Sequence, residues 1–94
     1  MGIIAITMRQ YVEPKYGEKR DSISTEWLTY LKKILPEFSF LLIPNNIDIA
    51  KDLLKTITID GLLLSNGNDW GSCPERDEVE KFCFSWCREN QKPI

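Results

Sequence analysis

The chain has 94 residues, which is enough for one domain of ordinary size and no more. Its 43% hydrophobic and 28% charged residues are typical of a globular protein and exclude a disordered or low-complexity chain. Twelve basic against fourteen acidic residues give a net charge of -2, which argues against a nucleic-acid partner or an anionic membrane surface. The sequence contains no histidine, so these residues alone exclude Ser-His-Asp catalysis, Cys-His catalysis and histidine-containing metal sites. We therefore expect no metal and no cofactor.

The N-terminal segment and the cysteines indicate the compartment. No stretch reaches the roughly 18 consecutive apolar residues that cross a bilayer, and the first residues lack the basic segment and cleavage site of a secretory signal. Three cysteines, at positions 73, 83 and 87, are an odd number and form no disulfide framework. We expect reduced thiols in a cytoplasmic protein, with Cys83 in the core and Cys87 half exposed.

The first half of the chain predicts two buried strands with a helix between them. Residues 3–7 are a continuous apolar run, as in a strand that is buried on both faces. Residues 8–21 are polar, with a proline and a glycine, and predict a long loop. Apolar residues then recur at helical spacing over 27–35, with Asp21 or Ser22 as the expected cap and Pro36 as the stop. Residues 38–43 form the second apolar run.

The second half repeats this alternation. Asn46 is a suitable N-cap for a helix over 47–56. Residues 60–65 predict the third strand, which leads into a loop rich in Asn and Gly. Pro74 suits the first position of a third helix, with acidic residues in its first turn. Residues 92–94 then resemble the start of a fourth strand.

The order β-α-β-α-β-α predicts an α/β fold, with three layers and a parallel, flavodoxin-like sheet between helices. Such an open sheet usually has about five or more strands. We therefore expect residues 1–94 to be the N-terminal portion of a larger domain. The alternative is that the last residues are a short tail.

Sites in parallel α/β sheets form at the carboxyl ends of the strands. Three predicted loops lie at that edge, over residues 8–21, 44–46 and 65–73. The third has the sequence Ser-Asn-Gly-Asn-Asp-Trp-Gly, in which a glycine allows a backbone amide to point into a site and stabilise an oxyanion. The simpler interpretation of such a loop is a turn.

These segments together resemble the N-terminal part of a class I glutamine amidotransferase-like domain, and within that group the γ-glutamyl hydrolases. The resemblance covers essentially the whole chain and rests on the order and spacing of four stretches. They are the opening strand (Ile-Ala-Ile-Thr-Met-Arg, 4–9), the Tyr-Gly-Glu and Arg-Asp pair before Trp27 (16–21), the strand and loop Asp-Gly-Leu-Leu-Leu-Ser-Asn-Gly-Asn-Asp (60–69), and Pro-Glu-Arg-Asp followed by Glu80 (74–77).

The resemblance implies a cysteine hydrolase that acts on γ-glutamyl amide bonds through a thioester. It assigns the backbone amide of Gly67 to the oxyanion site. Asn66 departs from the usual first glycine of this loop, although related carbamoyl-phosphate synthetase subunits have Ser-Asn-Gly there. The family's nucleophile lies a few residues after position 94, and its His and Glu lie further on. None of the three cysteines of this chain matches the nucleophile position, so we expect the 94 residues alone to be inactive.

Several polar residues near the predicted edge are candidates for binding a γ-glutamyl substrate. Arg9, Gln10 and Arg20, with Asp21 beside them, could recognise the α-carboxylate and α-amine of a glutamyl group. In the third loop, Asn68 and Asp69 could order the backbone, Asn66 lies next to the oxyanion amide, and Trp70 could form a wall of the pocket. Ordinary solvated loops and turns are the alternative. Arg76, Asp77 and Glu80 are expected to form ion pairs that fix the third helix.

Two other functions remain open at this point. One is a non-catalytic binding or split-enzyme module, which associates with itself or with a partner chain at an open sheet edge. The other is an unrelated flavodoxin-like or receiver-like module. The second is disfavoured because the first loop has no phosphate-binding glycine pattern and no acidic pair follows the first strand. The sequence does not define the leaving group of a γ-glutamyl substrate.

Overall fold

The computed structural model describes residues 2–65, 67 and 71–94. Helices and strands follow one another in the order β1 (Gly2–Thr7), β2 (Arg9–Val12), β3 (Lys19–Ser22), α1 (Thr25–Ile34), β4 (Phe38–Ile43), α2 (Ile47–Thr56), β5 (Gly61–Leu63) and α3 (Pro74–Glu89). None of the described helices is long and apolar enough to cross a membrane.

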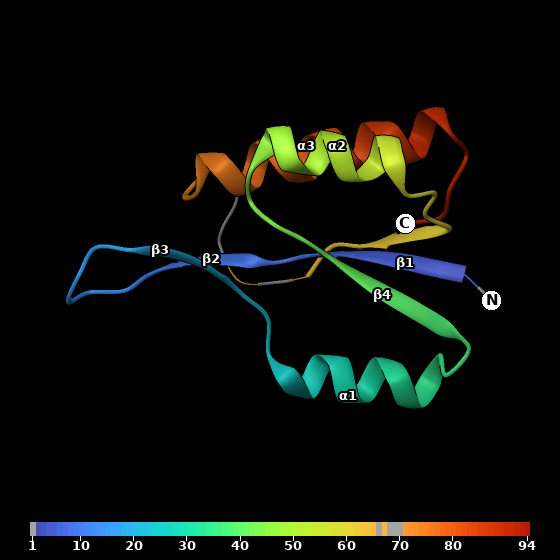
Figure 1. The fold of residues 1–94 in the computed structure, drawn as a ribbon, viewed down its shortest axis with the longest axis horizontal. Coiled ribbons are helices and arrows are strands. Elements are labelled where there is room, and N and C mark those ends of the chain that lie inside the picture. Colours follow the sequence, from blue (N-terminus) through green and yellow to red (C-terminus); the bar gives the residue numbers. More distant parts are fainter. Residues whose placement is uncertain (1, 66, 68–70) are drawn as a thin grey trace.

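Three strands form a parallel sheet in the order β4-β1-β5. β1 is central and pairs along its whole length with β4, from Gly2 opposite Phe38 to Thr7 opposite Ile43. α1 lies on one side of this sheet, while α2 and α3 lie together on the other side (Figure 1). The fold is therefore the α/β arrangement that the sequence predicts, with the strand order of the first part of a flavodoxin-like sheet.

The main core lies between the sheet and the pair α2 and α3. β1 and β4 alternate their side chains between the two faces of the sheet, and one set meets the apolar faces of the two helices. The fully or nearly buried members are Ala5, Ile43, Ala50, Leu54, Ile59, Leu62, Val79, Cys83 and Cys87. The expectation of a half-exposed Cys87 is therefore wrong. Because Cys87 is one helical turn after Cys83, it lies on the same inner face of α3.

The long loop predicted for residues 8–21 is instead a β-hairpin. β2 and β3 pair antiparallel, with Arg9 opposite Ser22 and Val12 opposite Lys19. Its tip is closed by two backbone hydrogen bonds, from the Gly17 amide to the Glu13 carbonyl and from the Glu13 amide to the Glu18 carbonyl, and Gly17 adopts a φ of 68° there. The hairpin projects beyond the end of the main sheet (Figure 1). It buries almost no side chains, so it lacks the alternation of apolar residues by which a strand is recognised in a sequence.

The helix starts follow local capping. Ser24 caps α1 by accepting a hydrogen bond from the Glu26 amide, so the expected cap at Asp21 or Ser22 is wrong. Those two residues still belong to the hairpin, and the turn into the helix begins only after them. Asn46 caps α2 as predicted, with its side chain accepting from the Ile49 amide.

The chain returns to the sheet after α3. The Leu62 amide donates a hydrogen bond of 2.9 Å to the Pro93 carbonyl. β5 itself is shorter than predicted, because only Gly61–Leu63 pair with β1. The segment around Pro93 thus lies next to β5, on the side away from β1.

Candidate functional site

The sheet has one neighbouring strand on each side of β1. The chain passes from β1 to β4 on one side, and then from β4 across to β5 on the other side. The carboxyl ends of β1 and β5 therefore border the point where the strand order reverses. In open α/β sheets, ligands bind in the crevice at such a point. The residues at these two strand ends are Thr7 and Ser65.

Two hydrogen bonds join these strand ends, and Ser65 is the donor in both. The Ser65 backbone N–H donates to Thr7 Oγ1 at 3.1 Å, and the Ser65 hydroxyl donates to the Thr7 carbonyl at 2.6 Å. Thr7 is completely buried, and its own hydroxyl donates to Glu80 Oε2 of α3 at 2.7 Å. The single hydroxyl of Thr7 thus links both strands to the helix.

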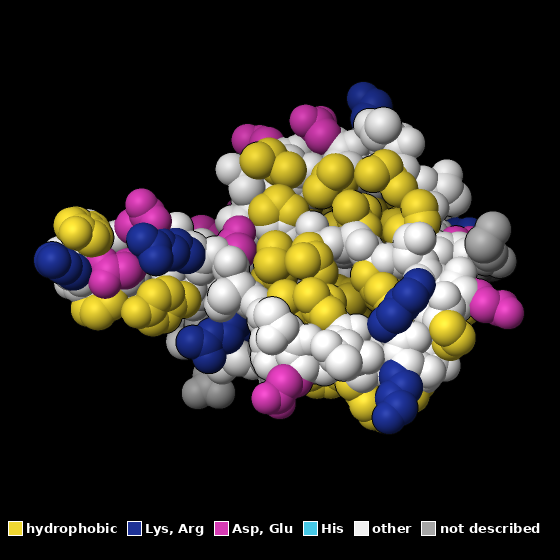
Figure 2. Space-filling model, turned by 60° about the horizontal axis from the view of Figure 1, so that its bottom comes forward, with side chains coloured by type: hydrophobic (Ala, Val, Ile, Leu, Met, Phe, Trp, Pro, Cys, Tyr) yellow, Lys and Arg dark blue, Asp and Glu magenta, His cyan; other side chains and the backbone are white. Residues whose placement is uncertain are grey.

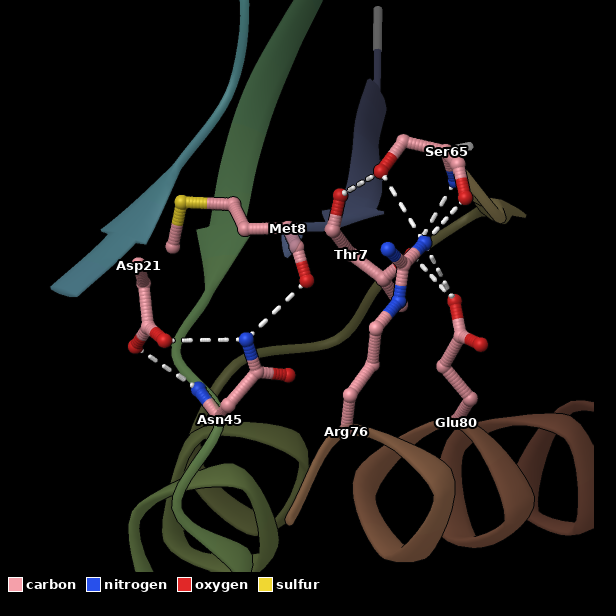
Figure 3. Close-up of polar contacts among 7 residues, drawn as sticks. All are labelled: Thr7, Met8, Asp21, Asn45, Ser65, Arg76 and Glu80. Atoms are coloured by element: carbon pink, nitrogen blue, oxygen red, sulfur yellow. Dashed lines mark hydrogen bonds and ion pairs between the residues drawn. The ribbon is translucent and has the colours of Figure 1, made fainter. Parts of the chain in front are cut away.

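An arginine from the first turn of α3 completes this cluster (Figure 3). Arg76 is only 2% exposed, and its guanidinium donates to the Ser65 carbonyl. It also pairs with Glu80, one helical turn further along α3, at 3.1 Å. The predicted ion pairing of these two residues is therefore confirmed. Asp77 instead accepts a hydrogen bond from the Gly71 amide at 2.8 Å.

We call this four-residue network the strand-end cluster; its members are Thr7, Ser65, Arg76 and Glu80. It bonds both polar groups of the Ser65 backbone, so it fixes the start of the loop after β5 against β1 and α3. A buried charge that is paired and hydrogen-bonded avoids the large cost of desolvating it alone. The cluster is therefore suited to hold a loop in position.

Gly67 lies directly against this cluster. Its φ is 145°, in a region that side chains rarely adopt. A Cβ atom at Gly67 would lie 2.5 Å from the Arg9 Cβ and 3.0 Å from the Arg76 Nη1. The backbone of Gly67 is exposed nonetheless. Glycine is thus required here by both conformation and space, at an exposed position beside the end of β1.

A second polar contact joins the hairpin to the sheet. Asp21 accepts hydrogen bonds from the Asn45 backbone amide and from its side-chain amide, each at 2.9 Å. The same Asn45 side chain donates to the Met8 carbonyl at 3.0 Å (Figure 3). Asn45 is 6% exposed, and its Oδ1 has no hydrogen-bond partner among the residues that the structure describes. This contact, the Asp21–Asn45 latch, ties the end of β3 to the end of β4.

The substrate-binding candidates fall into different places. Arg9 begins β2 next to Gly67, where it is exposed and forms no ion pair within the described residues. Gln10 is half-buried and accepts a hydrogen bond of 3.5 Å from the Cys73 thiol. Arg20 is exposed on β3 and pairs with Glu18 at 2.5 Å. Arg9 and Gln10 thus lie near Gly67 and the start of α3, whereas Arg20 lies opposite Tyr11 in the hairpin and its side chain is paired with Glu18.

The remaining candidates, Asn66, Asn68, Asp69 and Trp70, lie outside the described residues. Beside the strand-end cluster, a hollow of about 390 Å³ is lined by Leu64, Glu80, Lys81 and Phe84. It opens between the end of β5 and α3, and two of its walls are the exposed apolar side chains of Leu64 and Phe84.

The cysteines of α3 are poor nucleophiles. Burial raises the pKa of the Cys83 thiol to about 12, with smaller contributions from Cys87 and Glu80. Burial also raises the pKa of Cys87, against a smaller opposing effect of Lys92. Since the thiolate is the reactive form, both side chains stay protonated at neutral pH. They act as core residues.

Three residues of the site are absent from the sequence-based candidates, namely Thr7, Ser65 and Asn45. Each is a polar residue at or just after the end of an apolar strand, and the parallel sheet brings such ends to one edge. A polar residue at the end of an apolar run can therefore be recognised in the sequence as a candidate for the site. The partner of each residue is not predictable in this way, because the contacts span up to 73 residues of sequence.

Comparisons with models of protein families, with curated proteins and with solved structures found no match to this chain. Among residues 2–65, 67 and 71–94, no group of three or more Cys, Asp or Glu side chains is arranged to hold a metal ion.

Proposed function

We propose that these 94 residues are the leading part of a class I glutamine amidotransferase-like domain, which hydrolyses γ-glutamyl amide bonds of small molecules in the cytoplasm. In this proposal the backbone amide of Gly67 stabilises the oxyanion. The nucleophilic Cys and the His and Glu that activate it belong to chain beyond Ile94. The substrate is a γ-glutamyl amide, and neither nucleic acid nor membrane takes part.

The observation that carries this proposal is the position of Gly67. Gly67 comes two residues after Ser65, which the strand-end cluster holds at the reversal point of the sheet. Gly67 is exposed there and has a backbone conformation that only glycine tolerates well. An oxyanion site needs a rigid, exposed backbone donor, because preorganised donors stabilise developing charge without reorganising. Arg9 is an exposed residue whose Cβ and Cδ lie beside Gly67, and an arginine there is suited to the carboxylate of a glutamyl group.

The segment around Pro93 supports the same proposal. It lies beside β5, and a parallel strand continuing from it would run toward the sheet edge at Gly67. A cysteine at the end of such a strand could attack a γ-glutamyl carbonyl next to the oxyanion donor. The thioester would form as the amine leaves with a proton from the His, and water would then release glutamate.

The first test is to read the coding frame beyond codon 94. The proposal expects a Gly-x-Cys-x-Gly elbow within a few residues and a His-x-Glu further on. The encoded protein should then release the amine from γ-glutamyl-4-nitroanilide or a γ-glutamyl alkylamine. A chain ending at residue 94 should give no turnover above the blank. A stop codon directly after codon 94, or turnover by the 94 residues alone, would contradict the proposal.

A stop codon would favour the second candidate, a split module that binds a partner chain carrying the nucleophile. Affinity capture from the native host, followed by a search for a chain with a Gly-x-Cys-x-Gly elbow, tests that candidate directly. Recovery of no such chain would exclude it.

A further inference from the structure

The hairpin of β2 and β3 has one face that meets the rest of the molecule. Gln10 lies opposite Asp21 and Val12 lies opposite Lys19. Because side chains alternate along a strand and directly opposite residues share a side, these four residues lie on one face of the hairpin. Three of the four have polar partners outside the hairpin. We call this face the docked face.

Two contacts join the docked face to the start of α3. Cys73, the N-cap residue of α3, donates from its thiol to Gln10 Oε1 at 3.5 Å. Lys19 forms an ion pair of 3.2 Å with Glu75 in the first turn of the same helix. In Figure 1 this first turn of α3 accordingly lies above β2. The hairpin is thus docked on the helix that also carries Arg76.

The docked position depends on polar contacts that are individually weak. The side chains of Lys19 and Glu75 are 59% and 38% exposed, so salt screens their attraction and the pair contributes little. A thiol is a weak donor. Figure 2 shows the hairpin as a projection that carries charged side chains of both signs. Segments with few buried apolar contacts open locally at low free energy, so the hairpin can leave α3 while the core stays folded.

Gly67 lies between the hairpin and α3. A Cβ atom at Gly67 would meet the Arg9 side chain at 2.5 and 3.1 Å and Arg76 Nη1 at 3.0 Å. Arg76 is buried and is held by Ser65 and Glu80 of the strand-end cluster. Arg9, in contrast, is the first residue of β2. Gly67 therefore has one fixed neighbour and one neighbour that belongs to the hairpin.

We propose that the docked hairpin positions the backbone amide of Gly67, with Gln10 and Lys19 as the positioning residues. The inference rests on the proposed function, in which this amide stabilises the oxyanion. In the docked state, Arg9 is held against Gly67 and confines its backbone from one side, while Arg76 confines it from the other. In the undocked state, only Arg76 remains. Because an oxyanion donor is effective only when it is preorganised, undocking lowers the rate of the chemical step.

An NMR experiment on the full encoded chain tests this positioning without any activity. Isotopic labelling of the glycines alone restricts the spectrum to glycine amides, and the Gly67 signal is the one missing from Gly67→Ala. Lys19→Glu turns the attraction to Glu75 into a repulsion and should shift the Gly67 signal. The charge-reversed double variant, Lys19→Glu with Glu75→Lys, should return it toward its original place. Gly61 is paired with Ile4 inside the sheet, and its signal should stay unchanged as an internal reference.

Two further variants separate docking from a change in charge. Gln10→Ala removes the acceptor of the Cys73 thiol without altering any charge, and it should shift the Gly67 signal in the same direction as Lys19→Glu. Lys15→Glu is the matched control, because Lys15 lies over the Tyr16 ring at the tip of the hairpin, at 5.5 Å from the ring centre. It makes the same charge change on the same hairpin and should leave Gly67 in place. Far-UV circular dichroism verifies that the variants keep their helices.

Hydrolysis of a γ-glutamyl amide provides the second measurement. Lys19→Glu should lower kcat about tenfold, which is less than the roughly 10²–10³-fold effect of losing a donor completely. The charge-reversed double variant should recover most of this loss, which a mere change of surface charge would not explain. A Gly67 signal that stays in place in both Lys19→Glu and Gln10→Ala would overturn the proposal. An unchanged kcat in a variant whose Gly67 signal has shifted would also overturn it. If the unaltered protein showed no hydrolysis at all, the proposed function would fail, and the NMR result would still decide whether the hairpin positions Gly67.

Discussion

Ser65 donates two hydrogen bonds to Thr7 across the reversal point of the sheet, one from its backbone amide at 3.1 Å and one from its hydroxyl at 2.6 Å. The contact joins residues that are 58 positions apart in the sequence. It has the effect of a further rung on the β1–β5 ladder, beyond the point where regular pairing ends at Leu63. The loop that leads to Gly67 therefore starts from a fixed position.

The first prediction concerns the Thr7 hydroxyl. Thr7→Val keeps the shape of the side chain but removes both an acceptor for the Ser65 amide and a donor to Glu80. Leaving buried polar groups without partners costs about 1–3 kcal/mol. We expect Thr7→Val to lower the free energy of unfolding by about this amount in urea titrations. Thr7→Ser keeps the hydroxyl and should lose less, and equal losses for both variants would contradict the role of the hydrogen bonds.

The second prediction concerns the buried ion pair. Arg76 and Glu80 have side chains that are only 3% and 13% exposed. Arg76→Met removes one charge and leaves Glu80 largely buried without it, which typically costs about 3–5 kcal/mol. The double variant Arg76→Met with Glu80→Gln removes the uncompensated charge and should recover part of the loss. If the double variant were as unstable as the sum of both single variants, the two charges would not be coupled.

The third prediction concerns Gly67. In Gly67→Ala, the new Cβ would meet Arg9 and Arg76 at distances that require one of them to move, and φ would remain at 145°. We expect a loss of about 1–3 kcal/mol in stability. Gly17→Ala is the matched control, because Gly17 also has a positive φ but no atom lies within 4 Å of its Cβ position. The control measures the cost of a left-handed φ of 68° without a clash, and Gly67→Ala should exceed it both through its φ of 145° and through the contacts with Arg9 and Arg76.

Gly67 also provides a test of the proposed activity. In a protein with γ-glutamyl hydrolase activity, Gly67→Pro removes the backbone N–H and should lower kcat about 10²–10³-fold, as for the loss of one oxyanion donor. KM should change much less. An unchanged kcat in a folded variant would remove Gly67 from the proposed site.

The sequence predicts the main layers of this fold well, because each core strand is a continuous apolar run and each helix has an apolar face at its proper period. The sequence does not predict the hairpin over residues 9–22. That segment is stabilised by its own backbone pairing and by the Asp21–Asn45 latch, neither of which produces a hydrophobic pattern. The helix start shifted to Ser24 for the same reason, since the preceding residues pair with β2.

The candidate site is predictable only in part. The Asn- and Gly-containing loop after β5 and the acidic and basic residues of α3 are visible in the sequence. The role of Arg76 in holding the Ser65 carbonyl is not, because it depends on how α3 packs against the end of β5. The position of Arg20 on the outer part of the hairpin follows from the β2–β3 register, which a polar segment does not reveal.

The fourth prediction concerns the Asp21–Asn45 latch. Asp21→Ala removes two acceptors and leaves the Asn45 backbone amide without its partner at the end of β4. We expect a loss of about 1–3 kcal/mol in stability and faster amide hydrogen exchange in β2 and β3. The adjacent Arg20→Ala removes an exposed ion pair with Glu18 and should cost less than about 1 kcal/mol. If both variants behaved alike, the latch would have no special role.

The fifth prediction concerns pH. Burial raises the pKa of the Cys83 thiol from 9.0 to about 12 and also raises that of Cys87. In the unfolded chain these thiols lose their protons near pH 9, while in the folded chain they keep them. Above this pH the unfolded state therefore binds fewer protons, and stability falls as pH rises. The contribution of the neutral thiols is complete below about pH 8.5 and is lost progressively toward pH 12.

Urea unfolding in a reducing buffer from pH 7 to pH 11 measures this dependence. Each thiol contributes a slope of at most about 1.4 kcal/mol per pH unit. Lysines and tyrosines also titrate in this range, so the diagnostic quantity is the difference between the wild-type chain and Cys83→Ala. The lost packing in Cys83→Ala shifts stability equally at every pH, whereas removal of the thiol makes the alkaline slope shallower. Parallel curves above pH 9 would show that the Cys83 proton is not linked to folding.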